Sequence, residues 1–213
     1  MKKFILIILP VLIWIALVGC GAKKLNTIKV NTDFKSKEEL IKEAVSNFYL
    51  KSDAKNNGEL IIYNTKTYKN NYLVLAEKYS GDGHRSTNLF IIDDKFSITR
   101  WTSGETPISN CFSINKCILD KSTILFGTFN NSKWDPKQDI KIPVQISNID
   151  ISFKSGQNIK EDVSNETGYI IALDSITEVQ QFNLFNEKNE LQSNLDEIGN
   201  IYITELNDFK IKL

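Results

Sequence analysis

The segment SKEELIKEAVSNF, residues 36–48, predicts the strongest helix of the chain and requires a layer for that helix to pack on. Ser36 and Glu39 have the spacing of a capping box, in which each side chain satisfies the free amide of the other residue. The residues that recur at helical spacing are apolar on one face and charged on the other: Leu40, Ile41, Ala44, Val45 and Phe48 against Lys37, Glu38, Lys42 and Glu43. An apolar stripe of this kind needs a sheet beneath it.

The next part of the chain supplies that sheet. It contains short runs rich in Ile, Val, Leu and aromatic residues, separated by turn signals, over residues 59–65, 71–79, 88–92 and 96–101. In the second run Tyr72, Val74 and Ala76 alternate with Leu73, Leu75 and Glu77, as in a half-buried strand. We therefore expect residues 33–105 to form an antiparallel β-meander with the helix on one face.

The helical period disappears after residues 103–107, and a second β region is expected over residues 106–213. Candidate strands cover residues 110–118, 123–129, 140–144, 148–153, 168–173, 178–186 and 200–205. About seven strands at this spacing are typical of a β-sandwich. Leucines within residues 191–198 suggest one helical turn. The expected fold class is mainly β (α+β), with an N-terminal helix packed on an antiparallel meander and then an Ig-like β-sandwich.

The beginning of the chain has the parts of an export signal. Lys2 and Lys3 precede an apolar run over residues 4–18, and small residues then lead to Cys20. The motif Leu17-Val18-Gly19-Cys20 resembles the lipobox of bacterial lipoprotein precursors. This resemblance implies that residues 1–19 are a cleaved signal peptide and that Cys20 carries a diacylglycerol, with palmitate as a typical acyl group. The alternative is an uncleaved apolar helix, and both alternatives leave the bulk of the chain outside the cytoplasm.

Residues 20–32 are expected to be a lipidated tether. They are polar, lack a clear periodicity and contain Lys23, Lys24 and Lys29. A flexible coil of about a dozen residues spans roughly 20 Å, so the folded part would stay close to the membrane. Lys23 and Lys24 are either solvated or in contact with anionic headgroups. The expected location is the extracytoplasmic side of the cell membrane.

The composition excludes some classes of partner. Removal of Lys2 and Lys3 from the 26 Lys and Arg residues leaves 24 against 26 Asp and Glu, a net charge of about −2. Acidic and basic residues are interspersed along the chain and form no basic block, so a nucleic-acid partner is not expected. The bias toward Asn, Lys and Ile is typical of an AT-rich bacterial genome.

Two later segments carry a wider resemblance. They are TILFGTFNNSKW (123–134) and GYIIALDSITEVQQFNLFNEKNEL (168–191). With them, the mature chain resembles small uncharacterised surface lipoproteins of Gram-positive bacteria of the clostridial and bacillar groups. The first segment would be a strand that enters a glycine turn, and the second a hairpin with a polar tip. The resemblance does not point to any particular enzymatic activity.

Cys111 and Cys117 remain as an even pair once Cys20 is assigned to lipid. Exported proteins retain disulfides, and a turn near Ile114–Asn115 would bring the two sulfurs together. The alternative is a pair of buried thiols that act as small apolar side chains. A redox or zinc site is not expected, because the pair lacks the C-x-x-C spacing and additional histidines.

One segment of the chain carries a candidate for catalytic chemistry. His84 is the only histidine, and it follows Asp82 in a glycine-rich segment between two expected strands. That pattern is typical of a solvated hairpin tip, and an acid–histidine site is the alternative. Adjacent carboxylates such as Asp93 and Asp94 point apart on a strand and spread around a helix, so they do not predict an acid/base pair. Residues 186–197 lack the alternating acids and central glycine of an EF-hand loop. No metal and no cofactor are expected.

Tryptophans are the remaining points of interest. Trp134 is expected in a loop, within Asn131-Ser132-Lys133-Trp134-Asp135-Pro136, and Trp101 at the end of a strand. A tryptophan in a polar loop either folds over the edge of its own core or is an exposed binding anchor. Asp82, His84 and Trp134 are therefore the candidate binding residues.

The sequence favours a lipid-anchored extracytoplasmic module that binds a protein or another component of the cell envelope and has no catalytic activity. Exposed sheet edges and loops would provide the binding groups. A lipoprotein that captures a small ligand or ion is the first alternative. An envelope hydrolase that uses Asp82 and His84 is the second.

Overall fold

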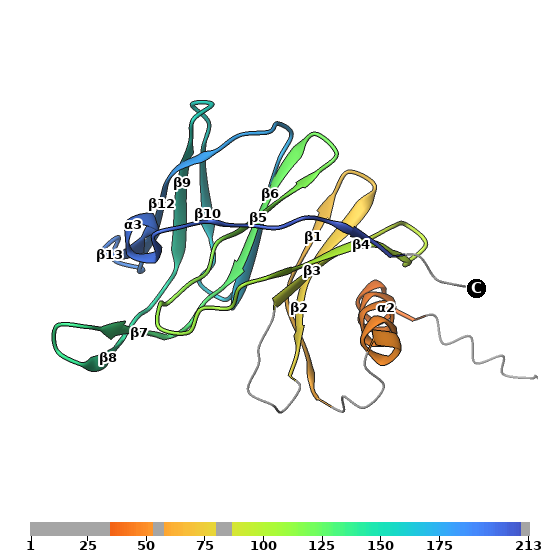
Figure 1. Cartoon of the computed structure of the whole chain (residues 1–213), viewed down its shortest axis with the longest axis horizontal. Helices are drawn as coiled ribbons and strands as arrows, with labels where there is room; N and C mark the ends of the chain where they lie inside the picture. The colour runs from red at the N-terminus through yellow and green to blue at the C-terminus, as the bar shows by residue number, and fades with distance from the viewer. Residues whose placement is uncertain (1–34, 53–57, 80–86, 210–213) are drawn as a thin grey trace, which may run out of the picture. The chain divides into compact units, whose positions relative to one another are not determined.

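A computed structural model describes residues 35–52, 58–79 and 87–209 (Figure 1). Residues Ser36–Leu213 form one compact unit, and the boundary expected at residues 105/106 lies inside it. Within the described residues the helices are α2 (Lys37–Ser52) and α3 (Leu195–Ile198). The strands are β1 (Leu60–Tyr68), β2 (Asn71–Lys78), β3 (Thr87–Ile92), β4 (Ile98–Gly104), β5 (Asn115–Leu119), β6 (Ser122–Thr128), β7 (Ser132–Asp135), β8 (Ile140–Pro143), β9 (Asn148–Phe153), β10 (Asn158–Asp162), β11 (Gly168–Leu173), β12 (Val179–Phe185), β13 (Leu191–Asn194), β14 (Tyr202–Ile203) and β15 (Asn207–Asp208).

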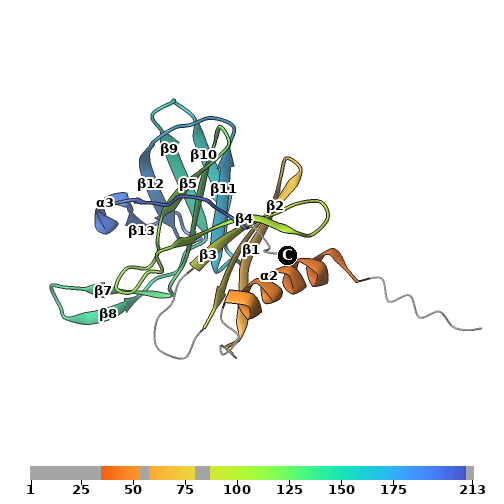
Figure 2. The ribbon, with the colours of Figure 1, turned by 45° about the vertical axis from the view of Figure 1, so that its right-hand side comes forward.

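The capping box at the start of α2 is confirmed. The amide of Ser36 donates to Glu39 Oε2 at 2.7 Å, and the amide of Glu39 donates to Ser36 Oγ at 3.2 Å. The buried face of the helix lies on one side of the β1–β4 sheet (Figure 2), where Phe48 is the centre of an aromatic cluster. Its ring centroid lies 4.9 Å from that of Phe90 and 5.1 Å from those of Trp101 and Phe209. Trp101 is therefore a packing residue.

The helix-covered sheet has the strand order β1-β2-β3-β4-β15, so the expected meander is present. Its inner strands are buried on both faces, however, whereas the sequence pattern predicted a half-buried strand. On β2, Val74 packs toward α2, while Leu73 and Leu75 pack against the next sheet. The predicted alternation is therefore present on β2, but both faces of the strand are buried, one by α2 and the other by the next sheet.

That next sheet, with the order β11-β6-β5-β14, is the central layer. Every residue of β6 is buried. Ile124 and Phe126 join the cluster shared with the meander, and Leu125 joins the cluster on the opposite side, shared with β9 and β12. The central sheet is thus covered on both faces, by the meander and by the sheet β10-β9-β12-β13.

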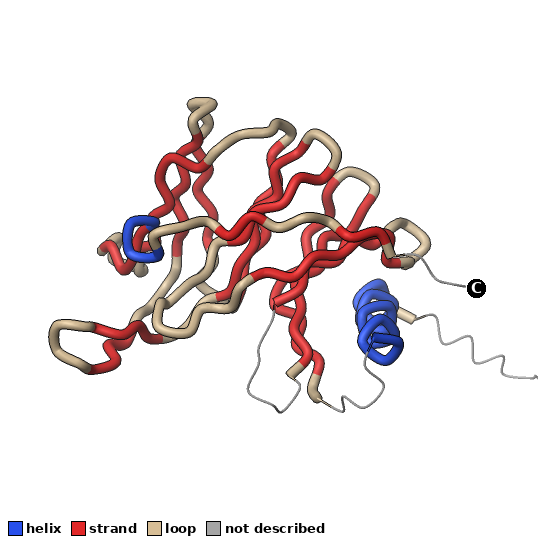
Figure 3. Tube along the Cα trace, viewed as in Figure 1, coloured by secondary structure: helices blue, strands red, loops and turns tan. Residues whose placement is uncertain are grey.

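The central sheet and the β10-β9-β12-β13 sheet form an Ig-like sandwich (Figure 3). With β5, β6, β9, β10, β11, β12 and β13 lettered A, B, C, C′, E, F and G, the two sheets have the orders A-B-E and C′-C-F-G. These are the orders of an immunoglobulin-like domain in which the strand after C pairs with C, as strand C′, instead of pairing with E in the other sheet, as strand D. The predicted fold class is therefore confirmed.

Local structure differs from the sequence predictions at several places. Gly127 lies within β6, not in a turn. β11 and β12 belong to different sheets, and the hairpin in that region is β12–β13. Residues 110–114 form a loop before β5, and Trp134 lies in a strand, β7. The separation of β11 from β12 follows from their pairing with the earlier strands β6 and β9, which the local pattern does not reveal, whereas Trp134 lies in a local hairpin with β8.

Side chains of β1 cover the edge of the central sheet at β11. Asn64 Nδ2 donates to the carbonyl of Gly168 at 3.2 Å, and Lys66 Nζ donates to the carbonyl of Ile170 at 3.0 Å. Lys66 also pairs with Glu161 of β10 at 2.7 Å. These bonds satisfy edge carbonyls that would otherwise be open to another strand.

At the other edge, residues 200–209 connect the layers. Tyr202 and Ile203 of β14 run parallel to β5, and Asn207 and Asp208 of β15 pair with β4. Phe209 then packs on Phe48 of α2. This segment links the sandwich to the meander.

Gly127→Ala is expected to destabilise the unit by about 3 kcal/mol, because overpacking that moves the backbone lies at the high end of its usual cost. A Cβ atom at Gly127 would lie 2.0 Å from the carbonyl oxygen of Ser113. Equilibrium urea unfolding measures the loss.

Gly156→Ala is the control. Gly156 has a φ of 82°, but a Cβ atom added there would have no other atom within 4 Å. Only the backbone cost of about 1 kcal/mol therefore applies. Equal losses in the two variants would contradict this account of Gly127.

Candidate binding surface

Three adjoining hollows lie at one end of the sandwich, with volumes of about 520, 500 and 460 Å³. They are bordered by the loop 105–110, the β7–β8 hairpin and α3, and Ser109 lines all of them. In Figure 1 the β7–β8 hairpin projects from the body of the sandwich. We call the region formed by residues 107–110, β7–β8 and α3 the hairpin surface.

Asn115 fixes the base of the 105–114 loop. This fully buried side chain accepts a hydrogen bond from the amide of Glu105 at 2.7 Å and donates to the carbonyls of Glu105 and Phe126 at 3.1 and 3.2 Å. A Cβ atom on Gly104 would lie 2.5 Å from the amide carbon of Asn115. The end of β4 is thereby held directly on the central sheet.

The far end of the loop is fixed to the strand connection after β6. Asn130 Nδ2 donates to the carbonyls of Pro107 and Asn110 at 2.9 and 3.0 Å. The amide of Trp134 donates to the carbonyl of Ser109 at 2.8 Å, so the loop occupies the outer edge of β7. The hairpin surface is consequently a hydrogen-bonded assembly of two segments.

The hairpin itself is held by its tip and by an ion pair. Asp135 Oδ1 accepts the amide of Lys137 at 2.8 Å, which closes the turn after β7. At the base, Lys133 Nζ donates to the carbonyl of Gln192 at 2.7 Å and pairs with Glu197 at 2.9 Å. These contacts attach β7 to β13 and α3.

Large apolar side chains remain exposed on this fixed framework. Ile108 is 90% exposed, Ile140 46% and Trp134 42%. Trp134 therefore does not fold over the core. Of the two alternatives for this tryptophan, the exposed position agrees with the structure. Ile108, Lys133 and Glu197 have no signal in the sequence, because their role depends on contacts between distant segments.

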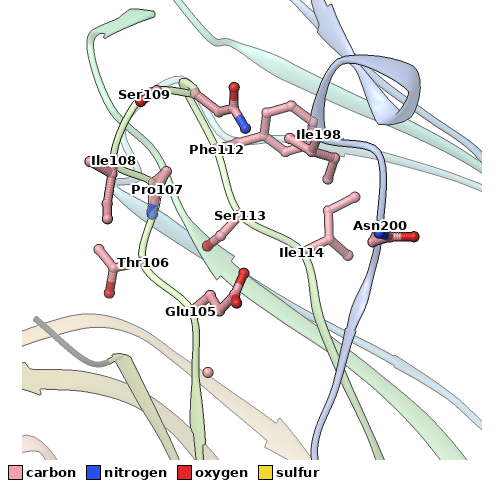
Figure 4. Close-up of a pocket in the computed structure, with 12 residues that line it drawn as sticks. Glu105, Thr106, Pro107, Ile108, Ser109, Phe112, Ser113, Ile114, Ile198 and Asn200 are labelled. Atoms are coloured by element: carbon pink, nitrogen blue, oxygen red, sulfur yellow. The ribbon is translucent and has the colours of Figure 1, made fainter.

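The first hollow lies beside the two arms of the 105–114 loop, with Ile198 and Asn200 across from them (Figure 4). Its apolar lining comes from Phe112, Ile114 and Ile198, and Glu105 is the charged residue in its lining. A space of about 520 Å³ lies within the range of small-molecule sites.

Comparison of the chain with protein-family models, with curated proteins and with solved structures finds no match.

Cys111 and Cys117 are free and buried, and they lie in different hydrophobic clusters. Cys111 belongs to the sandwich core and Cys117 to the interface between the meander and the central sheet. Residues 113 and 114 lead directly into β5, so the hairpin turn near Ile114–Asn115 that a disulfide would need does not form. The structure thus agrees with the buried-thiol alternative rather than with the disulfide.

The remaining candidate residues, Cys20, Asp82 and His84, lie outside the described residues. Within the described ranges, no three His, Cys, Asp or Glu side chains are grouped so that they could hold a metal ion. No helix in the same ranges is long and apolar enough to cross a membrane.

One further polar cluster resembles a serine–lysine pair but serves packing. Lys69 Nζ and the hydroxyl of Tyr68 both contact Ser122 Oγ, at 3.0 and 2.7 Å, and both also contact Asp174. The hydrogen bonds to Tyr68 and Asp174 raise the pKa of Lys69, so this amine is protonated at neutral pH and cannot accept a proton from Ser122. The cluster joins the β1–β2 turn to the central sheet.

Both buried thiols are expected to resist alkylation in the native protein at neutral pH. Burial raises the pKa of the Cys117 thiol to about 12 and also raises that of Cys111, and the thiolate is the reactive form. Mass spectrometry after treatment with iodoacetamide should show both unmodified in the native state and both modified in guanidinium chloride. A failure of either to react in denaturant without reductant would indicate a disulfide and contradict the structure.

Proposed function

We propose that this chain is a lipid-anchored extracytoplasmic binding module without catalytic activity, and that the hairpin surface contacts its partner in the cell envelope. The observation that carries the proposal is the exposure of Trp134 on a hairpin that is fixed by Ser109 and Glu197. A hairpin whose backbone is already held in place loses less conformational freedom on binding than a flexible loop would.

The composition of the surface supports a binding role. Exposed apolar side chains with a polar rim are typical of interaction sites, and tryptophan is enriched among the residues that dominate binding energy. Ile108 and Trp134 line the same hollow, together with Lys141 and Ser132. The module would therefore combine an apolar contact with polar groups beside it.

The lipobox at residues 17–20 supports the anchored location. On this proposal Cys20 carries the lipid, and the polar segment that follows it keeps the folded unit near the outer face of the membrane. Cys20→Ser should abolish incorporation of radioactive palmitate, because it removes the thiol that would carry the lipid. Unchanged palmitate labelling in this variant would contradict lipidation at Cys20.

Capture of a small ligand is the second candidate function. The hollow beside the 105–114 loop favours it, because Glu105 borders a lining of Phe112, Ile114 and Ile198. A ligand with a cationic group and an apolar part would suit this lining. The residues of an envelope hydrolase, Asp82 and His84, lie outside the described residues.

Photo-crosslinking in cells tests the binding role. A photoreactive amino acid is placed at position 140 of the hairpin or, as a matched control, at position 202 of β14, where the natural residues Ile140 and Tyr202 are both 46% exposed. We expect one dominant adduct from position 140 and none from position 202. Equal adducts from the two positions, or none from either with the protein abundant in the membrane, would contradict the proposal.

A further inference from the structure

We infer that the hairpin surface binds an uncharged oligosaccharide, with one sugar ring on the indole of Trp134 and the neighbouring rings in the hollows beside it. This inference rests on the proposed binding function and names the class of envelope component that the same surface would take. It is carried by the arrangement of the hollows, the chemistry of their lining and the balance of charge.

The arrangement of the hollows fits an elongated ligand. The cavities of about 500 and 460 Å³ share Ser109, Lys133 and Trp134, so the indole borders both of them. The hollow of about 520 Å³ continues from the 460 Å³ cavity along the same loop, through Ser109 and Ile108. A linear chain of rings that crosses Trp134 would occupy several of these spaces at once, whereas a compact ligand would fill one.

The lining fits a molecule with apolar faces and hydroxyl edges. A pyranose ring presents C–H groups on its faces, which pack on an aromatic surface, and hydroxyl groups around its rim. The half-exposed indole of Trp134 provides such a surface. The polar side chains beside it in the two cavities offer both donors and acceptors, as hydroxyl groups require: Ser109, Asn110, Lys137, Asn131, Ser132 and Lys141.

The charge balance favours a neutral ligand over an anionic polymer or an anionic lipid surface. Lys133 is paired with Glu197. The other two lysines of the hairpin, Lys137 and Lys141, are matched in number by Asp135 and Asp139. Asp196 of α3 adds a further acidic residue, so the surface has no excess positive charge with which to attract phosphate or carboxylate groups.

The strand edges disfavour an extended peptide. Peptides that add to a sheet need a free row of backbone amides and carbonyls. On β7 the amide of Trp134 already donates to the carbonyl of Ser109. On β8 the edge is only four residues long and contains Pro143, which has no N–H group. Recognition at this surface therefore depends on side chains, which suits sugar hydroxyls.

The test uses the full-length protein in phosphatidylcholine nanodiscs, which contain no sugar. The probes are cellotetraose, tetra-N-acetylchitotetraose, maltotetraose and mannotetraose, each titrated by isothermal calorimetry. We expect at least one to bind with a Kd of about 10 µM to 1 mM, that is, with about 4–7 kcal/mol. Absence of binding by all four would overturn the inference.

Variants assign the binding to the indole. Trp134→Ala should weaken the affinity for the bound probe at least tenfold, and Trp134→Phe by less than that, because the phenyl ring retains part of the stacking surface. Tyr202→Ala, at an equally accessible aromatic outside the hairpin surface, should leave the affinity unchanged. Undiminished binding by Trp134→Ala would overturn the inference.

The outcome is separable from that of the proposed function. A dominant protein adduct from position 140, with no binding of any probe, would overturn the oligosaccharide inference and leave the binding module in place. Binding of a probe that depends on Trp134, with no adduct in cells, would support the sugar site and contradict a partner in the envelope.

Discussion

The burial of the central sheet on both faces is the constraint on which the rest of the structure depends. Antiparallel sheets commonly have one solvated face, but β6 has no exposed residue. Ile124 and Phe126 need the meander, and Leu125 needs the β9–β12 side of the sandwich. Removal of either outer layer would expose large side chains that each contribute about 1.5–3 kcal/mol when buried. The two halves of the chain are therefore one energetic unit.

This constraint also places the hairpin surface. The start of β5 lies beside the end of β6 because the two strands are antiparallel. The 105–114 loop enters at that point, and the β7–β8 hairpin leaves from it, with a bridge between Phe112 and Phe129. The pairing of β5 with β6 thus brings these two connections together at one end of the central sheet. Their side chains are held by the rigid strands below, as is common for functional loops on a stable framework.

Local rules predicted the parts of the fold that local interactions determine. The capping box at Ser36 and Glu39 and the alternation on β2 are of this kind, and both appear in the structure. Gly127 was misassigned to a turn because glycine is common in turns, whereas here it permits a close approach to Ser113. The candidate surface was only partly predictable. Trp134 was visible as an unusual residue, but the pairing of Lys133 with Glu197 joins residues 64 positions apart, and no sequence pattern reports it.

The strand β14 has a consequence for folding kinetics. It pairs in parallel with β5, from a distant part of the chain, and β15 then reaches back to β4. Contacts between distant segments require costly loop closure and form late in folding. Until residues 200–209 dock, the β5 side of the central sheet is an unprotected strand edge. A partly folded chain in which this edge is open would be exposed to pairing with another copy, so the yield of native protein is expected to depend on how quickly residues 200–209 dock.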